Sequence, residues 1–411
     1  MPILLFEDEQ VTQLYPVSVG KPAFLLSCGS FRLLDLVTQI DPHVQVRVRP
    51  HLRAVHDADY PAPTTGARGD EPILLVNARL VPSVEVIAQL EELRRTGKPC
   101  RVNNGTNLAV ALLPLGTEMP PVDTPMHDLQ WRVDRCELPI IELDLPLFAY
   151  PHDIVRHHLT SLPGNLDYRL KQGAYREIAD GVFAAEGASL GQFVVTDTRK
   201  GPIVLDQGAS VGPYCYISGP AHLGQGARVI EHAAIKDGVS LGHTTKIGGE
   251  VEGSVIEPYT NKQHHGFLGH SYLGSWVNLG AGTCNSDLKN TYGQVNMEYW
   301  GQRVPTGMQF IGTIVGDYAK TAINTGIFTG KTVGACSMLY GFVTTNVPSF
   351  VNYARLFGQV TEAPVDVMVA TQARMFARRN VSQRPCDIQL LHDMYELTRH
   401  ERQLAGEPLS L

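Results

Sequence analysis

The sequence predicts a two-part fold, in which an α/β layer domain precedes a solenoid of short parallel strands that ends in C-terminal helices. Strand-like and helix-like segments alternate within residues 1–150, a six-residue period runs from residue 203 to residue 339, and helix-period stretches fill residues 364–404. A chain of 411 residues is also longer than one ordinary hydrophobic core, so two or three domains are expected.

The six-residue period defines the middle of the chain. Every sixth position from Ile203 is small or β-branched, and a second apolar set follows two residues later, on the same face of each predicted strand. The first set is Ile203, Ala209, Cys215, Ala221, Ala227, Ala233, Val239, Thr245 and Val251, and the second is Leu205, Val211, Ile217, Leu223, Val229, Ile235, Leu241 and Ile247. This pattern resembles the hexapeptide repeat of left-handed parallel β-helices, and it predicts such a solenoid over residues 188–348.

Two breaks interrupt the period. The register slips by two between Val251 and Ser271, and a polar segment separates Thr283 from Thr313. Loops that leave a rigid solenoid are natural places for binding groups. The histidines of the first break are therefore the first candidates for function.

The flanking segments follow other periods. ILLF (3–6) and PILLVNARLVP (72–82) read as buried strands, and FRLLDLV (31–37) and VEVIAQLEELRR (84–95) as helices, which indicates an α/β layer domain over residues 1–150. We expect a helical linker over residues 151–187 and an amphipathic helical region over residues 349–411.

Composition excludes several classes of protein. The chain is 43% hydrophobic and 18% charged, with a formal net charge of -7 and no concentrated Lys/Arg run, so a nucleic-acid surface is not expected. Seven dispersed cysteines without a CxxC pair indicate reduced thiols. The acidic start MPILLFEDEQ is unlike a signal peptide, and no run of about 18 apolar residues is present. We therefore expect a cytoplasmic protein.

Residues 261–290 read NKQHHGFLGHSYLGSWVNLGAGTCNSDLKN. This stretch resembles the bifunctional UDP-N-acetylglucosamine pyrophosphorylase/glucosamine-1-phosphate N-acetyltransferases, in particular a bacterial branch with a reduced N-terminal half. Weaker matches are GDYAKTAINTG (316–326) and LYPVSVGKP (14–22). The resemblance implies an N-terminal nucleotidyltransferase-like domain, an acetyl-CoA-dependent transferase in the solenoid, and a homotrimer that acts on an amino-sugar phosphate and a nucleotide sugar.

His264 is the predicted catalytic base. In the family the catalytic histidine precedes the asparagine of VN-[IL]-GAGT by fourteen residues, and here that asparagine is Asn278, so the count leads to His264. The alternative, His270 in GHSYLG, lies only eight residues before Asn278 and would place the base on the wrong side of the solenoid. The role of His265 and His270 stays open.

The same resemblance assigns the binding residues. Acceptor contacts are implied for Asn285, Lys289 and, where the family has a tyrosine, Phe267, and acyl-CoA contacts for Ala281, Asp317 and Ala335. The chemistry of their side chains adds Asn278 and Lys262 to the expected acceptor contacts. The chemistry suits these residue types. A neutral imidazole can take a proton from the attacking amine, amides can orient hydroxyl groups, and a lysine can neutralise a phosphate.

A zinc enzyme is the alternative from another class. Hexapeptide-fold carbonic anhydrases use a histidine pair five residues apart, as His265 and His270 are, and His243 or His232 could supply a third ligand. That alternative leaves VNLGAGT and NSDLKN unexplained, so no metal site is assigned.

The front domain departs from its family. No glycine precedes Gly20 where a phosphate-binding loop is expected, Glu7, Asp8 and Glu9 stand there instead, and Arg79 occupies the place of a magnesium-binding aspartate. Arg79 and the amide-rich NNGTNLAVAL (103–112) could contact phosphate. Magnesium-dependent uridylyl or thymidylyl transfer is a second possible function, and a nucleotide-sugar scaffold or sensor is a third.

Overall fold

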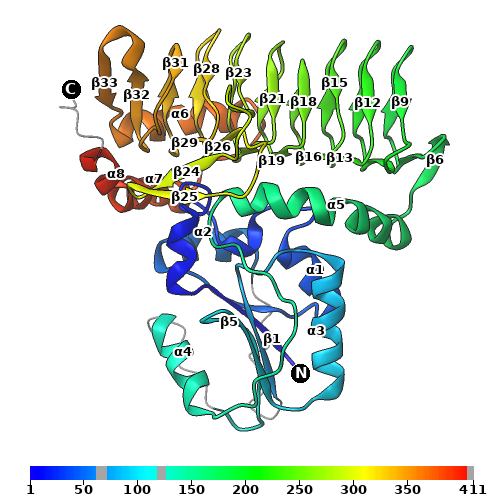
Figure 1. Cartoon of the computed structure of the whole chain (residues 1–411), viewed down its shortest axis with the longest axis vertical. Coiled ribbons are helices and arrows are strands. Elements are labelled where there is room, and N and C mark those ends of the chain that lie inside the picture. Colours follow the sequence, from blue (N-terminus) through cyan, green and yellow to red (C-terminus); the bar gives the residue numbers. More distant parts are fainter. Residues whose placement is uncertain (62–71, 118–125, 405–411) are drawn as a thin grey trace.

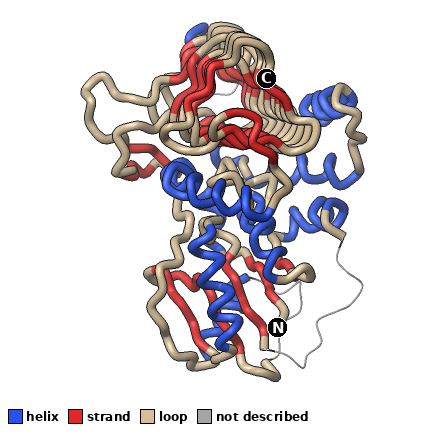
Figure 2. Tube along the Cα trace, turned by 90° about the vertical axis from the view of Figure 1, so that its right-hand side faces the viewer, coloured by secondary structure: helices blue, strands red, loops and turns tan. Residues whose placement is uncertain are grey.

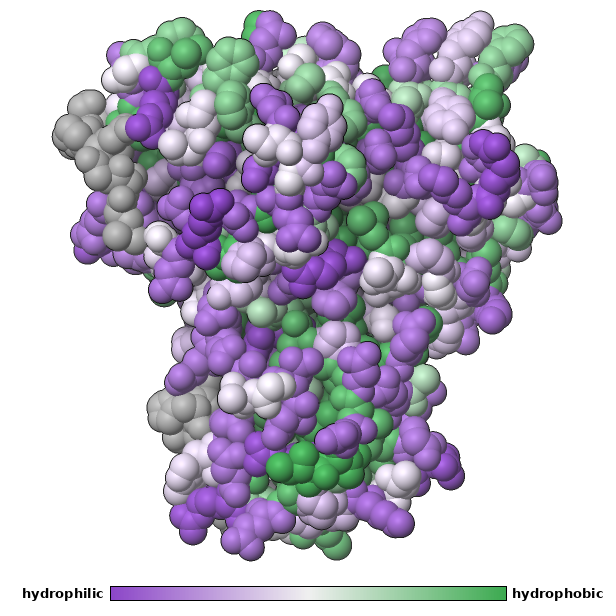
Figure 3. Space-filling view, viewed as in Figure 1, coloured by the Kyte–Doolittle hydropathy of each residue, from purple (hydrophilic) through white to green (hydrophobic). Residues whose placement is uncertain are grey.

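The computed structural model describes residues 1–61, 72–117 and 126–404, and it has the predicted two parts, a solenoid and a smaller front domain joined by a long helix (Figure 1). None of the helices in these ranges is long and apolar enough to cross a membrane. In the face shown in Figure 3, hydrophilic residues cover most of the surface, with an apolar area over the front-domain sheet.

The front domain is a five-stranded sheet in the order β2-β1-β3-β5-β4. β1 is parallel to β2 and β3, whereas β5 is antiparallel to β3 and β4, so the domain is of the predicted α/β class with a mixed sheet. Its strands are β1 (Ile3–Phe6), β2 (Gln45–Arg47), β3 (Ile73–Asn77), β4 (Cys100–Asn104) and β5 (Asn107–Leu113). Its helices are α1 (Leu33–Ile40), α2 (Arg53–Asp59), α3 (Val84–Thr96) and α4 (Met126–Arg135), with 3-10 turns at Glu9–Leu14, Ala23–Leu25 and Pro50–Leu52.

The solenoid confirms the predicted left-handed β-helix class. Seen end on, its short parallel strands stack into a triangular prism (Figure 2). The strands pair coil on coil, as Ile203 pairs with Ala221 and Ser210 with Arg228, which are eighteen residues apart. Both predicted apolar sets lie in the interior, where Ile203, Leu205 and Ala221 are fully buried.

The first face of the prism is one continuous sheet, whereas the second and third faces each consist of two sheets. The first face consists of β6 (Arg176–Ala179), β7 (Val182–Ala184), β10 (Ile203–Leu205), β13 (Ala221–Leu223), β16 (Val239–Leu241), β19 (Val255–Ile256), β22 (Tyr272–Leu273), β26 (Thr313–Val315) and β29 (Lys331–Val333). The second face consists of β8 (Ser189–Leu190), β11 (Ser210–Val211), β14 (Arg228–Val229), β17 (Lys246–Ile247), β20 (Asn261–Lys262), β27 (Lys320–Thr321), β30 (Met338–Leu339), β32 (Val351–Ala354) and β33 (Gln359–Glu362). The third face consists of β9 (Val195–Asp197), β12 (Tyr216–Ser218), β15 (Ala234–Ile235), β18 (Glu250–Glu252), β21 (Phe267–Gly269), β23 (Cys284–Asn285), β28 (Gly326–Ile327) and β31 (Phe342–Val343).

Both predicted breaks occur where the coils change length. Lys246 pairs with Asn261 fifteen residues on, and Asn261 bridges Asn278 seventeen residues on, so the slip is absorbed at the corners while strand register is kept. Asn278 next bridges Lys320, which means that the chain between them makes an excursion out of the solenoid. That excursion contains the hairpin of β24 (Asn296–Tyr299) and β25 (Gln302–Pro305).

The boundaries differ from the predicted ranges at both ends of the solenoid. The linker helix α5 (His152–Gln172) ends early, and β6 and β7 already belong to the first face. After residue 348 the chain adds β32 and β33 before the helices α6 (Val365–Ala377), α7 (Pro385–Leu397) and α8 (Arg399–Leu404). The 3-10 turn Arg355–Phe357 connects these two strands.

The two parts share one buried interface. The outward side chains Val255, Tyr272 and Ile314 of the first face belong to the same apolar core as the front-domain strands. Polar contacts cross this interface as well. Lys21 Nζ lies 3.0 Å from Asp317 Oδ1, and Glu257 accepts hydrogen bonds from Ser27 and from the Tyr272 hydroxyl.

The hairpin of β24 and β25 ties several parts of the chain together. The Tyr299 hydroxyl is 3.0 Å from His152 Nδ1 on α5, and the Trp300 ring stacks on His400 of α8 with centroids 4.6 Å apart. Asn346 in a later coil donates to the Glu298 carbonyl. The excursion therefore contacts the linker helix, the last helix and the solenoid.

His158 on α5 predicts an acid-sensitive contact. Its Nδ1 accepts from Gly29 N at 2.9 Å and its Nε2 lies 3.0 Å from the Gly238 carbonyl, and burial lowers its pKa from 6.5 to about 4. Because the folded protein keeps this histidine neutral, the unfolded chain binds a proton at a higher pH than the folded chain does. The free energy of unfolding therefore falls as pH falls from 6.5 through about 4. We expect the free energy of unfolding to fall by about 3 kcal/mol over that pH range because of His158.

The variant His158→Gln provides the measurement. A glutamine can donate to Gly238 and accept from Gly29 without titrating. The free energy of unfolding by urea should fall more steeply between pH 7 and pH 4 in the wild type than in His158→Gln. Parallel pH curves for the two proteins would contradict the assignment.

Candidate functional site

His264 lies at a corner of the solenoid, directly after β20. Its side chain is exposed and lines a cavity of about 630 Å³, together with Asn278 and Ala281. Three residues predicted for the acceptor, the base and the donor therefore surround one space.

The coil pairing explains how these residues meet. Asn278 bridges Asn261 on the second face, so its exposed side chain stands one strand beyond β20. Gly282 N donates to the His265 carbonyl, which holds the GAGT turn against the corner with His264. Gly282 has a φ of 76°, and a Cβ there would lie 2.1 Å from Asn324 Oδ1, so the turn requires glycine.

Lys262 has a different place from the one predicted. It stands in register with Ile247, its side chain is buried in the solenoid, and its Nζ donates to the Gly248 carbonyl at 2.8 Å and the His264 carbonyl at 3.1 Å. Burial lowers its pKa to about 8. Lys262 therefore supports the corner that carries His264, and its ammonium group does not line the cavity.

The NSDLKN residues also make contacts within the chain. The Asn285 amide accepts from Gly269 N at 2.9 Å and donates to the Gly269 carbonyl at 3.1 Å. Lys289 Nζ donates to the Gln294 carbonyl, and Phe267 N donates to Cys284 Sγ. None of Asn285, Lys289 and Phe267 is among the residues that line the cavity of His264.

Asp317 and Ala335 lie under the front domain. Asp317 pairs with Lys21 and accepts from Ser275 N at 2.7 Å, and Ala335 is fully buried with its N–H donating to Ser349 Oγ. The structure thus separates these two predicted donor contacts from Ala281.

The histidines of the zinc alternative do not converge within one chain. His270 Nδ1 lies 2.8 Å from Asp287 Oδ2, His232 stacks on Tyr214, and His243 packs edge-on against Tyr259, while His265 is exposed. Within residues 1–61, 72–117 and 126–404, no group of three His, Cys, Asp or Glu side chains could hold a metal ion.

The predicted front-domain phosphate contacts are also engaged internally. Arg79 Nη2 lies 2.6 Å from Asp8 Oδ2 and its Nη1 donates to the Phe148 carbonyl, while Glu7 pairs with Arg49. NNGTNLAVAL forms the β4–β5 hairpin. Because Glu7 and Asp8 already neutralise arginines, the residues at this end of β1 do not fit a magnesium site.

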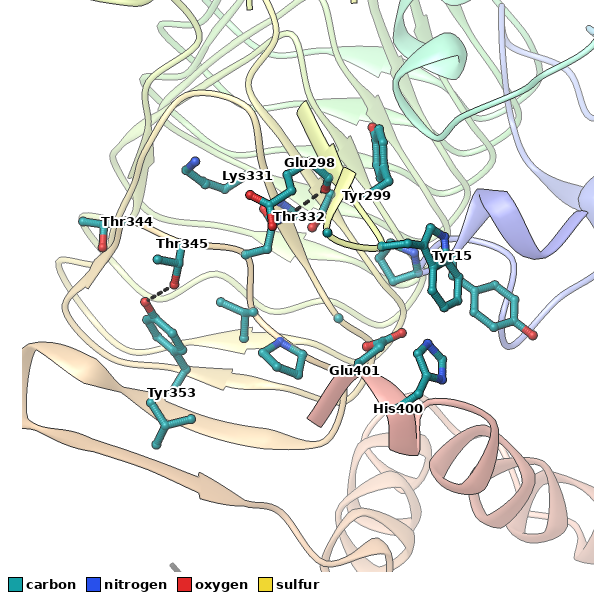
Figure 4. A pocket seen from close by; sticks show the side chains of 18 of the residues that line it. Tyr15, Glu298, Tyr299, Lys331, Thr332, Thr344, Thr345, Tyr353, His400 and Glu401 are labelled. Carbon is teal, nitrogen blue, oxygen red and sulfur yellow. Dashed lines mark hydrogen bonds between the residues drawn. The ribbon is translucent and has the colours of Figure 1, made fainter. Parts of the chain in front are cut away.

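A second cavity of about 480 Å³ lies between the β24–β25 hairpin, the last coils and α8 (Figure 4). Trp300, Lys331, Arg355 and Glu401 are among its lining residues. Burial raises the pKa of Glu401, which accepts a hydrogen bond from Ser349 N at 2.8 Å. Gly334, which precedes Ala335, lines this cavity, but Ala335 and the other predicted site residues do not.

Four cationic residues of the His264 cavity were not predicted. Lys246 and Lys320 belong to the second face, and Arg378 and Arg379 follow α6. The strand pairing would have indicated Lys320, because it is the next residue in the row of Asn261 and Asn278. The sequence has no repeating pattern that would predict the docking of α6 at this corner, so Arg378 and Arg379 could not be found in the same way.

Sequence comparison confirms the resemblance to sugar nucleotidyltransferase and bifunctional relatives. The family model described as "Sugar nucleotidyl transferase" matches residues 3–170. A bifunctional sugar-1-phosphate nucleotidylyltransferase/acetyltransferase of Sulfurisphaera tokodaii is 29% identical over 149 residues, which cover 36% of this chain and 37% of that protein. The bifunctional protein GlmU of Cupriavidus pinatubonensis is 35% identical over 92 residues, covering 21% of this chain and 20% of that protein.

These matches span about a third or less of the curated relatives' length. Among solved structures, the UDP-N-acetylglucosamine acyltransferase of Francisella novicida has a TM-score of 0.36 and 16% identity, covering 57% of this chain and 79% of that chain. The solenoid is shown by the coil-on-coil strand register and the buried apolar sets of this chain.

Proposed function

We propose that this chain is a cytoplasmic acetyl-CoA-dependent N-acetyltransferase that acts on an amino-sugar phosphate, with glucosamine-1-phosphate as the first acceptor to test. The observation that carries the proposal is the meeting of His264, Asn278 and Ala281 around one cavity. The GlmU and nucleotidylyltransferase/acetyltransferase relatives support the same chemistry.

His264 acts as the general base. Its imidazole removes a proton from the sugar amine as the nitrogen attacks the thioester carbonyl, the tetrahedral intermediate collapses, and the thiolate leaves and is protonated to the free thiol. The Asn278 amide orients the acceptor, and the GAGT turn at Ala281 lies along the donor arm. Backbone N–H groups at the corner are suited to stabilise the oxyanion.

A homotrimer is part of the proposal. Large apolar side chains stand exposed on and beside the third face, including Val195 (60% exposed), Phe328 (50%) and Phe342 (54%). Phe328 and Phe342 contact each other near one end of this face and Val195 lies at the opposite end, and exposed apolar groups of this kind are candidate contacts with another copy. Analytical ultracentrifugation measures the state directly.

A thiol-release assay tests the activity. We expect turnover with acetyl-CoA and at least one of glucosamine-1-phosphate, glucosamine-6-phosphate and galactosamine-1-phosphate, with the acetylated sugar identified by mass spectrometry. No thiol release with any of these acceptors would contradict the proposed reaction.

Sugar-1-phosphate nucleotidyl transfer by the front domain is the second candidate. The family match over residues 3–170 favours it. The Asp8–Arg79 and Glu7–Arg49 pairs oppose the usual magnesium mechanism. Pyrophosphate release from UTP or dTTP with a panel of sugar phosphates would support this function, and its absence with all of them would leave a nucleotide-sugar scaffold.

A further inference from the structure

Four cations converge on the cavity that contains His264. Lys246, Lys320, Arg378 and Arg379 line it, and none of the lining residues within the described ranges is an aspartate or a glutamate. The chain as a whole carries a net charge of -7, so this local excess of positive charge opposes the overall balance.

The two lysines are placed by the strand register. Lys246 pairs with Asn261, Asn261 bridges Asn278, and Asn278 bridges Lys320, so these four side chains form one outward row on the second face. Lys320 Nζ donates to the Tyr318 carbonyl at 2.9 Å. The row therefore presents two amides with a lysine at each end, beside His264.

The two arginines are placed by α6. Phe376 of this helix packs on Trp276 with ring centroids 4.6 Å apart, and Trp276 stacks on Tyr259 at 4.2 Å. Arg379 Nη2 donates to Asn261 Oδ1 at 2.6 Å. These contacts dock the end of α6 against the row, so the C-terminal region supplies half of the positive charge in the cavity.

None of these four cations forms an ion pair within the part of the chain that the structure describes. Burial, then the nearby guanidinium groups of Arg379, Arg228 and Arg378, lowers the pKa of Lys246. Burial lowers the pKa of Lys320 to about 8, and burial and Arg378 lower that of Arg379. Clustered cations that disfavour their own charge are stabilised when an anion binds among them.

We propose that Lys246, Lys320, Arg378 and Arg379 form a phosphoryl-binding subsite beside His264, with α6 as one of its walls. The identity of the ligand rests on the proposed function, since both the sugar phosphate and coenzyme A carry phosphoryl groups. Arginine is suited to hold phosphate by two parallel hydrogen bonds, whereas lysine acts as a point charge.

Isothermal titration calorimetry on the full chain tests the subsite. The probes are inorganic pyrophosphate, glucosamine-1-phosphate against glucosamine, and coenzyme A against pantetheine. The variants are Arg378→Gln and Lys320→Gln, and Arg374→Gln is the matched control, because Arg374 is exposed on the same helix and does not line the cavity.

We expect Arg378→Gln and Lys320→Gln each to weaken pyrophosphate binding about tenfold, while Arg374→Gln binds like the wild type. A matching loss for glucosamine-1-phosphate assigns the subsite to the acceptor, and a matching loss for coenzyme A assigns it to the donor. Equal pyrophosphate affinity in the wild type and the Arg378→Gln/Lys320→Gln double variant would overturn the subsite.

The binding experiment and the thiol-release assay test two separate statements, so one can fail while the other succeeds. Charge-dependent pyrophosphate binding without any thiol release would retain the subsite and reject the acetyltransferase. Thiol release with unchanged phosphate binding in the variants would do the reverse.

Discussion

Replacing His264 by alanine should lower kcat for acetyl transfer by about 10²–10⁴-fold, the usual contribution of a positioned general base. The imidazole is exposed to the cavity that it shares with Asn278, and the His264 carbonyl accepts a hydrogen bond from Lys262 Nζ. The substitution therefore removes the proposed base and retains the backbone contact. Thiol release under saturating acetyl-CoA measures the loss.

His265→Ala is the matched control. His265 is the next residue, its side chain is also exposed, and its carbonyl accepts from Gly282 N. This variant should keep most of the activity, and both variants should keep the circular dichroism spectrum and the oligomeric state of the wild type. Full activity in His264→Ala would reject His264 as the base.

Asp317→Asn should destabilise the protein by about 3–5 kcal/mol, because it leaves a buried lysine without its partner. Asp317 and Lys21 are almost fully buried where the front domain meets the solenoid. Burial alone would lower the pKa of Lys21, but Asp317 and then Glu257 raise it. Urea unfolding and the melting temperature measure the effect.

Two further variants show whether the loss of stability comes from an unpaired buried charge. The double variant Lys21→Met/Asp317→Leu should lose less stability than Asp317→Asn, since it leaves no unpaired charge. Asp237→Asn, which breaks the exposed Lys200–Asp237 pair, should cost about 1 kcal/mol or less. If Asp317→Asn melts like Asp237→Asn, the interface pair does not stabilise the docking of the two parts.

The six-residue period was sufficient to predict the solenoid, because interior positions such as Ile203 and Leu205 must be apolar in every coil. His264 was predicted from the resemblance to the family motif, which has its histidine fourteen residues before the asparagine, and His264 and Asn278 line one cavity. The solenoid depends on contacts between neighbouring coils, which leave a repeating signal in the sequence, whereas the prediction of His264 needed the family motif.

Lys262, Asp317 and Ala335 were predicted to contact the substrates, but they do not line the cavity of His264. The shortened coil between Lys246 and Asn261 places Lys262 in the interior, where a lysine is unexpected. Asp317 and Ala335 are covered by the front domain, and α6 brings Arg378 to the cavity. These placements arise from docking between segments far apart in the sequence, and docking of this kind has no period.

The β24–β25 hairpin changes how this solenoid should unfold. A stack of coils in which each touches only its neighbours can open gradually from either end. Here the hairpin reaches α5, α8 and a later coil, so the C-terminal coils should open as one cooperative unit with the linker helix. Because α5 itself packs on Val204 and Asp206 of the first face, only the coil before β10 lies outside that unit, so amide hydrogen exchange should be fastest in residues 176–200.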